Sequence, residues 1–186
     1  MEPNYILKFD ETCFIPQESK TSWISKIAGA VLVLLLVFSF IFRVNMFAKM
    51  SVAALVLLFW VIIKNFPSDE AVPFPVELRF YEDCLVIYRE KHYAGKNKVW
   101  KEIAKYMYLD ISDCKYLKNK STKRIHIYGD FYLKRWKYNK DGSLQSAPIM
   151  DKTITKGMTF FSTMLTDVDV AGEIEAHSPI KVRIEG

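Results

Sequence analysis

Two long apolar runs dominate the pattern of hydrophobic and polar positions in the first third of the chain. No charged residue occurs from Ile27 to Phe42, and none occurs from Met50 to Ile63. A helix needs about 20 mostly apolar residues to cross the hydrocarbon core of a bilayer. Both runs reach that length, as segments 23–42 and 47–64, when flanking lysines extend toward the interface. The pattern therefore predicts a transmembrane helical hairpin over residues 23–64.

The residues around the two runs are typical of a membrane–water interface, where tryptophan, lysine and arginine concentrate. We predict this position for six of them: Trp23, Lys26, Arg43, Lys49, Trp60 and Lys64. The short connection places both termini on one side, and the basic residues beyond the runs indicate the cytoplasmic side. The interpretation is a multi-pass protein of the inner (plasma) membrane with both termini cytoplasmic. A helical hairpin buried in a soluble protein is the alternative, but no other helices are expected to cover it.

The rest of the chain has a pattern typical of β-strands. Three prolines within residues 65–75 predict a short, stiff linker. Alternating, β-branched and aromatic residues then recur between turn formers, and they predict about seven short antiparallel strands. The clearest of these segments are 76–81, 84–90, 106–116, 123–128 and 131–138. Residues Asn139–Gly142 predict a turn in which Gly142 adopts a positive φ.

One late segment, from Asp167 to His177, suits a helix. Acidic residues stand at its start and Pro179 follows its end. The predicted fold class is therefore a membrane α-helical hairpin plus a mainly β domain, a small β-barrel or sandwich with one C-terminal helix. The expected organisation is an N-terminal cytosolic tail, the hairpin, the linker and the β domain, over residues 1–22, 23–64, 65–75 and 76–186.

Three segments of the expected strands carry a pattern shared with known proteins. They are Leu78–Ile87, Tyr108–Asp113 and Arg124–Gly129. With the order of the elements, they resemble the YcxB-like and bacterial pleckstrin-homology (PH-like) membrane proteins. This resemblance implies a transmembrane hairpin followed by a cytosolic PH-like domain, in which the late helix closes one end of the barrel.

The size and element order are also similar to a second class of protein. These are two-transmembrane effectors of cyclic-oligonucleotide (CBASS) antiphage systems. In them, a small β-barrel is thought to bind a cyclic nucleotide and to drive oligomers that damage the membrane. This second resemblance implies a ligand-gated membrane effector as the alternative.

Positive charge is concentrated in the middle of the chain, although the whole chain carries a net charge of only +5. Residues 88–140 contain 15 basic and 5 acidic residues, a net charge of +10, with aromatic residues between them. A basic surface of this kind attracts anionic lipid head groups, and it can also receive the phosphates of a nucleotide. An ordinary solvated face of lysines has the same composition. The candidate lipid- or ligand-binding residues are Lys118, Lys120, Lys123, Arg124, Lys134 and Arg135.

Residue types that carry catalysis or bind metals show no recognisable spacing. The three histidines and the three cysteines form no metal-ligand pattern and no Cys-x-x-Cys pair. Cys84 and Cys114 lie in strand-like segments, where a small buried side chain is the simplest interpretation. The chain has no nucleophile elbow, phosphate loop or His-Glu-x-x-His motif. We therefore expect a protein that is not an enzyme and that has no cofactor or metal.

The function expected from these patterns is binding. We expect a membrane-anchored scaffold protein whose PH-like domain contacts anionic lipid head groups or a protein partner. Small residues at Ala28–Ala30 would allow a homo-oligomer through the hairpin. A nucleotide ligand belongs to the alternative, the gated effector, and nucleic acid is not an expected partner.

Overall fold

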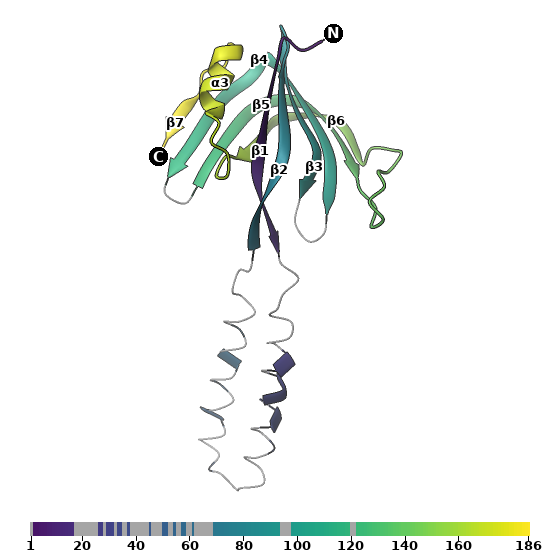
Figure 1. Ribbon diagram of the computed structural model, residues 1–186, viewed down its shortest axis with the longest axis vertical. Coiled ribbons are helices and arrows are strands. Elements are labelled where there is room, and N and C mark those ends of the chain that lie inside the picture. The colour runs from purple at the N-terminus through teal and green to yellow at the C-terminus, as the bar shows by residue number, and fades with distance from the viewer. Residues whose placement is uncertain are drawn as a thin grey trace. The chain divides into compact units, whose positions relative to one another are not determined.

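The computed structural model describes residues 2–16, 69–93, 98–119 and 122–186, together with single residues and short runs between Lys26 and Val61. The chain divides into two units (Figure 1). One unit consists of Met1–Ile15 and Ala71–Gly186, and the other of Pro16–Glu70. The first unit contains the sheet and the sites considered below.

The transmembrane prediction needs correction. Within the part of the chain that the structure describes, no helix is both long enough and apolar enough to cross a bilayer. The predicted fold class, a membrane hairpin followed by a β domain, is therefore wrong, and so are the membrane character and the multi-pass inner-membrane location that depended on it. The physical reason is that an apolar run is necessary but not sufficient, because a span also requires a continuous helix of about 20 residues.

The residues on which that prediction rested are only partly described. Most positions of segments 23–42 and 47–64 lie outside the described residues. Of the small residues expected to allow a homo-oligomer, Ala28 also lies outside them, whereas Gly29 and Ala30 are described. Of the predicted interface residues, Lys26 is described, and it is helical and exposed. The other five lie outside the described residues: Trp23, Arg43, Lys49, Trp60 and Lys64.

Seven strands form one sheet, and most neighbouring strands are antiparallel. The order is β1-β2-β3-β4-β5-β6, and β7 pairs with β4 in parallel. Helix α3 lies directly before β7 along the chain. The elements are β1 (Tyr5–Pro16), β2 (Asp69–Phe80), β3 (Cys84–Tyr93), β4 (Val99–Asn119), β5 (Thr122–Lys137), β6 (Met150–Ser162), α3 (Val170–His177) and β7 (Arg183–Glu185).

Strand β1 lies in the segment that the sequence analysis assigned to a tail. Its side chains alternate with the period of two that a strand requires, since Leu7 and Phe9 are buried whereas Lys8 and Asp10 are exposed. Part of the expected linker, from Asp69 onward, likewise belongs to β2. Its prolines precede Glu77–Phe80, the stretch whose register with β3 is established, so they remove no hydrogen bond from that ladder.

The long strands β4 and β5 bend where their pairing shifts register. Tyr106 pairs with Phe131, but the next pair joins Ile111 to Gly129, so β4 carries extra residues at this point. Gly129 has a φ of +148°, and a Cβ atom there would lie 2.1 Å from the carbonyl oxygen of Asp110. Only glycine fits such a close backbone approach. Leu109 lies in this bulge and points into solvent, with 99% of the residue exposed.

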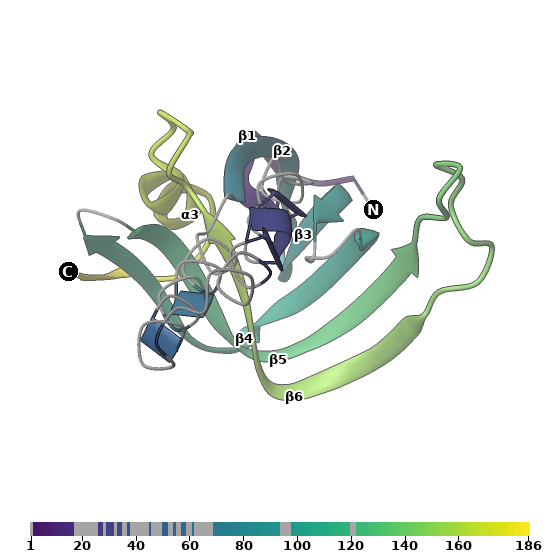
Figure 2. The ribbon, with the colours of Figure 1, turned by 90° about the horizontal axis from the view of Figure 1, so that it is seen from below.

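The bend makes the sheet curl, as Figure 2 shows from below. Side chains of β1 consequently meet the end of β6, although these strands are far apart in the sheet order. The ring centroids of Phe9 and Phe161 are 5.4 Å apart. The backbone N–H of Leu165, just after β6, donates to the Thr12 hydroxyl over 3.1 Å. The apolar core fills the inside of this curl.

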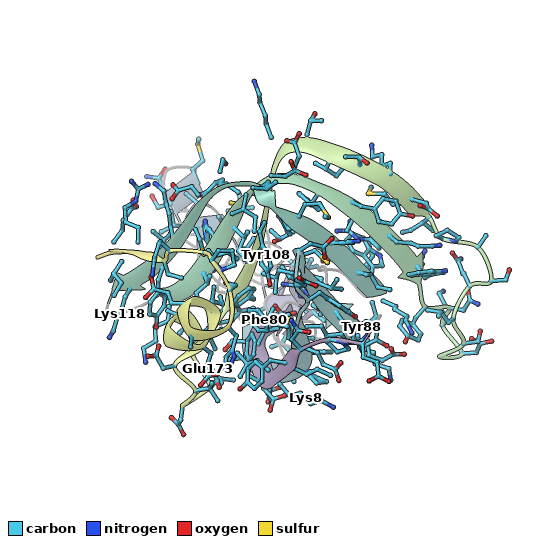
Figure 3. All side chains as sticks on the ribbon, turned by 90° about the horizontal axis from the view of Figure 1, so that it is seen from above. Lys8, Phe80, Tyr88, Tyr108, Lys118 and Glu173 are labelled. Atoms are coloured by element: carbon cyan, nitrogen blue, oxygen red, sulfur yellow. The ribbon has the colours of Figure 1, made fainter. Side chains whose placement is uncertain are left out.

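Helix α3 closes one end of the core. Asp169 caps its N-terminus, and Val170 and Ile174 are buried in the core cluster. The hydroxyl of Tyr5, at the start of β1, donates to Glu173 over 2.9 Å. Figure 3 shows Phe80 and Glu173 on this side of the molecule. Farther along β1 and β3, away from α3, the inward positions carry charged residues.

Candidate functional site

The structure separates the six basic residues that were predicted to form one binding surface. Lys118, Lys123 and Arg124 lie at the hairpin between β4 and β5, whereas Lys134 and Arg135 lie near the other end of β5. Eleven positions of a strand correspond to about 35 Å when it is straight, because each residue advances about 3.3 Å. Lys120 lies outside the described residues. The five described residues therefore do not form one continuous binding surface.

The two residues at the far end of β5 are held by acidic partners. Lys134 Nζ lies 3.3 Å from Asp151 Oδ2 on the outer face of the sheet. Arg135, the next residue, points inward and donates from its Nε to Glu102 Oε2 over 2.7 Å. Their charges are thus already compensated within the protein.

At the hairpin, two lysines oppose each other, and neither has an ion-pair partner in the part of the chain that the structure describes. Lys118 and Lys123 are direct register partners in the β4–β5 pair. The nearby Lys115, by contrast, forms ion pairs with Asp113 and Glu185. Like charges placed directly opposite each other destabilise a strand pair. This arrangement therefore costs stability unless an anion approaches both lysines.

Both lysines line a pocket of about 500 Å³ between the hairpin, α3 and β7. Figure 3 shows Lys118 on the side of the sheet where α3 and β7 lie. The other walls of the pocket include residues with hydroxyl groups and carboxylates: Tyr116, Thr163, Thr166, Asp167, Asp169 and Glu175. Two of these carboxylates have backbone partners, because Asp169 accepts from Gly172 N (3.2 Å) and Glu175 from Val182 N (2.9 Å).

Arg124 lies next to this hairpin but on the outer face. Its guanidinium lies 5.8 Å from the centre of the Phe160 ring. Its Nε is buried and has no hydrogen-bond partner among the described residues, and the same holds for Nε2 of His126, two residues farther along β5. Burial, together with the charges of Arg124 and Lys115, lowers the pKa of His126, which favours the neutral imidazole.

A second candidate site is a buried ion cluster centred on Arg89, whose side chain is only 2% exposed. Its Nε donates to Glu11 Oε1 over 2.9 Å, and its Nη1 donates to Glu102 Oε1 over 2.8 Å. Nη2 donates to the carbonyl oxygen of Phe160 over 2.7 Å. Arg89 therefore links β1, β3, β4 and β6, and both of its carboxylate partners are buried as well.

The carboxylates of this cluster are held in their ionised form. Burial alone would raise the pKa of Glu11, but the charge of Arg89 and the hydrogen bond from His92 outweigh it and the pKa is lowered. The pKa of Glu102 is lowered in the same way, against burial, by Arg89 and Arg135. A general acid needs a proton to donate near neutral pH. These two residues are consequently poorly suited to acid catalysis.

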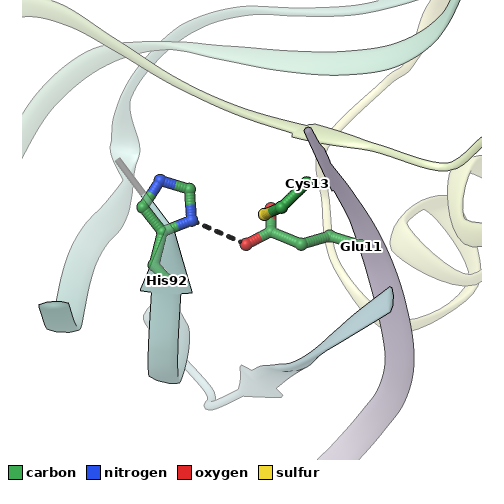
Figure 4. Close-up of side chains that lie close together, drawn as sticks. All are labelled: Glu11, Cys13 and His92. Carbon is green, nitrogen blue, oxygen red and sulfur yellow. Dashed lines mark hydrogen bonds and ion pairs between the residues drawn. The ribbon is translucent and has the colours of Figure 1, made fainter. Parts of the chain in front are cut away.

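His92 and Cys13 adjoin Glu11 at the edge of the cluster, as Figure 4 shows. Nδ1 of His92 lies 2.9 Å from Glu11 Oε1. One ligand-type atom from each of Glu11, Cys13 and His92 lies within 4.8 Å of the others. Burial raises the pKa of the Cys13 thiol to about 11, so it is protonated at neutral pH. Within the described residues, this trio is the group that could hold a metal ion.

The ion cluster forms one side of a pocket of about 290 Å³. Its polar wall consists of Arg89, His92, Glu102 and Arg135. Its apolar wall is formed by side chains and backbone of β5 and β6, namely Phe131, Leu133, Met150, Ile154, Met158 and Phe160. The guanidinium of Arg135 lies 4.2 Å from the centre of the Trp100 ring at the rim.

Sequence reasoning missed this cluster, although one signal was present. In β3, Leu85, Ile87 and Arg89 occupy alternate positions, so an arginine follows two core residues on the same face. Its acidic partners come from β1 and β4, far away in the sequence. A pairing of this kind depends on which strands become neighbours, and local spacing does not contain that information.

Comparisons with known proteins identify no relative of this chain. No family model matches, and neither a curated protein nor a solved structure is similar to it. The resemblance to YcxB-like and PH-like proteins, and that to cyclic-oligonucleotide effectors, remain predictions from the sequence. Function has to be inferred from the residues of the chain itself.

Proposed function

We propose that this protein is a non-catalytic binding protein, and that the pocket beside the β4–β5 hairpin takes a small phosphate-bearing ligand. The observation that carries the proposal is the opposition of Lys118 and Lys123 across the hairpin, where neither lysine forms an ion pair with a described residue. A phosphate group between two ammonium groups would relieve their repulsion and would form charge-assisted hydrogen bonds with both. Both lysines belong to the basic set that the sequence singled out.

The other walls of the pocket support a ligand larger than inorganic phosphate. A volume of about 500 Å³ lies in the range of small-molecule sites. Thr166 Oγ1 accepts a hydrogen bond from Val168 N over 3.3 Å, which leaves its hydroxyl proton free to donate to an anion. Asp167, on the same wall, favours hydrogen-bond donors on the ligand, such as sugar hydroxyls or a base amine. Nucleotides and sugar phosphates combine both features.

Binding without catalysis fits the ionisable groups that are present. The wall residues of this pocket include neither histidine nor cysteine, and the buried carboxylates elsewhere are held ionised by arginine side chains. The proposal concerns the phosphate chemistry of the ligand, which a nucleotide and a lipid head group share. It includes no membrane anchor.

The test is a thermal-shift and calorimetric screen of the full chain. The panel contains inorganic phosphate, mononucleotides, cyclic dinucleotides, cyclic trinucleotides and soluble inositol phosphates, so that a nucleotide source and a head-group source are distinguished. A ligand present at 100 times its Kd stabilises the fold by about 2.7 kcal/mol, which raises the melting temperature. We expect a shift with at least one organic phosphate.

Variants at the two ends of β5 locate the site. The double variant K118Q/K123Q removes both opposed charges and should abolish the shift. K134Q is the matched control, because Lys134 lies on the same strand, is also basic and is paired with Asp151. The proposal would be overturned if no compound of the panel raised the melting temperature, or if binding persisted unchanged in K118Q/K123Q.

A further inference from the structure

We propose that Glu11, Cys13 and His92 form a zinc-binding site, with three protein ligands and one open coordination position. The carboxylate, thiol and imidazole atoms of the three residues lie within 4.8 Å of one another inside the ion cluster (Figure 4). Oxygen, sulfur and nitrogen ligands together suit zinc, a borderline-soft ion that accepts all three. This site is separate from the lysine pocket and does not depend on the function proposed above.

The geometry of β1 places two of the three ligands side by side. Glu11 and Cys13 are two residues apart on β1, so their side chains leave the strand on the same face. Both are buried, at 2% and 7% exposure. Their common face is the inner one, which also carries Leu7 and Phe9.

A bulge in β3 turns the third ligand toward them. Arg89 pairs with Glu102 and His92 pairs with Trp100, so three steps on β3 correspond to two on β4. Strict alternation from the inward Arg89 would point residue 92 outward, but the extra residue reverses the alternation. Bulges often re-aim a side chain beside a functional site. Here the bulge brings Nδ1 of His92 to 2.9 Å from Glu11 Oε1.

The surrounding charges allow an added cation. Before the metal binds, Glu11 and Glu102 balance the charges of Arg89 and Arg135. Zn²⁺ together with a Cys13 thiolate therefore adds one net positive charge, which an anion in the open coordination position balances. Arg89 also contacts both oxygens of Glu11, at 2.9 and 3.3 Å. A carboxylate that ligates a metal is usually hydrogen-bonded by an outer-shell group, and Arg89 is that group for Glu11. Binding releases the Cys13 thiol proton to solvent and leaves the single ring proton of His92 on Nε2.

The site has a route to solvent through the neighbouring pocket. His92 belongs both to the trio and to the wall of the 290 Å³ pocket, and its side chain is 22% exposed. An ion entering from the pocket therefore meets His92 first. Three protein ligands leave a fourth position for water or a small anion, as in zinc sites that exchange ligands.

The decisive experiment is a titration of the full chain with Co²⁺ under reducing conditions. Cobalt replaces zinc in tetrahedral sites, and a coordinated thiolate produces an intense charge-transfer absorption in the near ultraviolet. We expect this absorption to saturate at about one equivalent and to disappear when Zn²⁺ is added. A chain that gives no charge-transfer absorption with cobalt contradicts the site.

Matched variants distinguish this cysteine and this histidine from the others. C13S should lose the charge-transfer absorption, whereas C84S should keep it, because Cys84 is also buried but lies outside the trio. H92Q should weaken metal binding by more than the factor of about 10–100 that loss of an outer-shell partner causes. H126Q should leave it unchanged. Absorption that survives in C13S, or that is lost equally in C84S, would overturn the assignment.

A second readout covers the case in which C13S does not fold. Zinc bound to β1 and β3 joins two strands that are not neighbours in the sheet order, so it should raise the melting temperature of the wild-type chain. The same addition should not raise the melting temperature of H92Q, whose altered side chain is partly exposed. An equal zinc-dependent rise in both chains would contradict the proposal.

Discussion

Arg89 and Glu102 lie directly opposite each other on β3 and β4, and they form an ion pair inside the protein. The distance from Nη1 to Oε1 is 2.8 Å, and neither side chain is more than 5% exposed. The same guanidinium binds Glu11 of β1 and the backbone of β6. Arg89 thus connects four strands at the end of the core that α3 does not cover.

Removing Arg89 should therefore destabilise the fold strongly. In R89M, the carboxylates of Glu11 and Glu102 lose their shared buried partner. Breaking a buried ion pair from one side costs about 3–5 kcal/mol, because the remaining charge stays desolvated. We expect a loss of this size in the free energy of unfolding, measured by urea denaturation.

An exposed ion pair on the same two strands provides the control for R89M. Lys101 lies 2.9 Å from Glu90, whose side chain is 48% exposed. Solvent-exposed pairs contribute about 0–1 kcal/mol. K101M should accordingly lower the free energy of unfolding by no more than about 1 kcal/mol. Equal losses in R89M and K101M would show that the buried network does not have the role described here.

Replacement of Gly129 should be far more costly than replacement of Gly142. Both have a positive φ, +148° and +84°. Strain of this kind costs about 1–3 kcal/mol for a residue with a Cβ atom. At Gly129 the Cβ atom would also lie 2.1 Å from the Asp110 carbonyl oxygen, whereas at Gly142 it would meet nothing within 4 Å. Denaturation of G129A and G142A should rank them in that order, and the reverse order would contradict the bend described at Gly129.

The opposed lysines should reduce the stability of the unliganded fold. K123Q removes one of two like charges that face each other across β4 and β5. We expect it to stabilise the chain by about 0.2–1 kcal/mol at low ionic strength, with a smaller gain at high salt because of screening. K134Q, which breaks an ion pair with Asp151, should give no such gain. A K123Q chain that is less stable than wild type at low salt would refute this account of the hairpin.

The free energy of unfolding should decrease once the pH exceeds the values at which exposed thiols and phenols ordinarily ionise. Burial raises the pKa of Cys114 from 9.0 to about 12 and that of Tyr106 from 10.0 to about 12. The folded chain retains these protons while the unfolded chain releases them, so the stabilising contribution is complete below about pH 9 and is lost up to about pH 12. Each group contributes a decrease of up to about 1.4 kcal/mol per pH unit within that window.

Urea denaturation at several alkaline pH values measures this decrease. C114A removes one of the two groups, and the free energy of unfolding should then fall less steeply with pH than in the wild-type chain. A wild-type profile that stays flat through the window, or one that C114A leaves equally steep, would contradict the burial of these protons.

Local patterns in the sequence predicted several strands, one turn and one helix. The segments 84–90 and 123–128 fall within β3 and β5, and 131–138 falls within β5 except for Tyr138, because alternation and β-branched residues indicate a strand with one buried side. Gly142 takes the positive φ expected of its turn. Val170 and Ile174, four residues apart, form the buried face of α3.

Other features followed from contacts between distant parts of the chain. Gly129 separates two expected strands in the sequence, but it lies within β5, where the backbone of β4 approaches closely. Such positions cannot be interpreted from their neighbours alone.

The sequence by itself determined the β-rich character of the chain, the inward and outward faces of its strands, and the concentration of basic residues in the middle. The tertiary structure decided which charges meet. It joined Glu11 to Arg89 and His92, residues 78 and 81 positions later, and it placed Lys123 and Arg135 of β5 in the walls of two different pockets. The reason is physical: a strand's periodicity is local, whereas its neighbours are chosen by the curvature and register of the whole sheet.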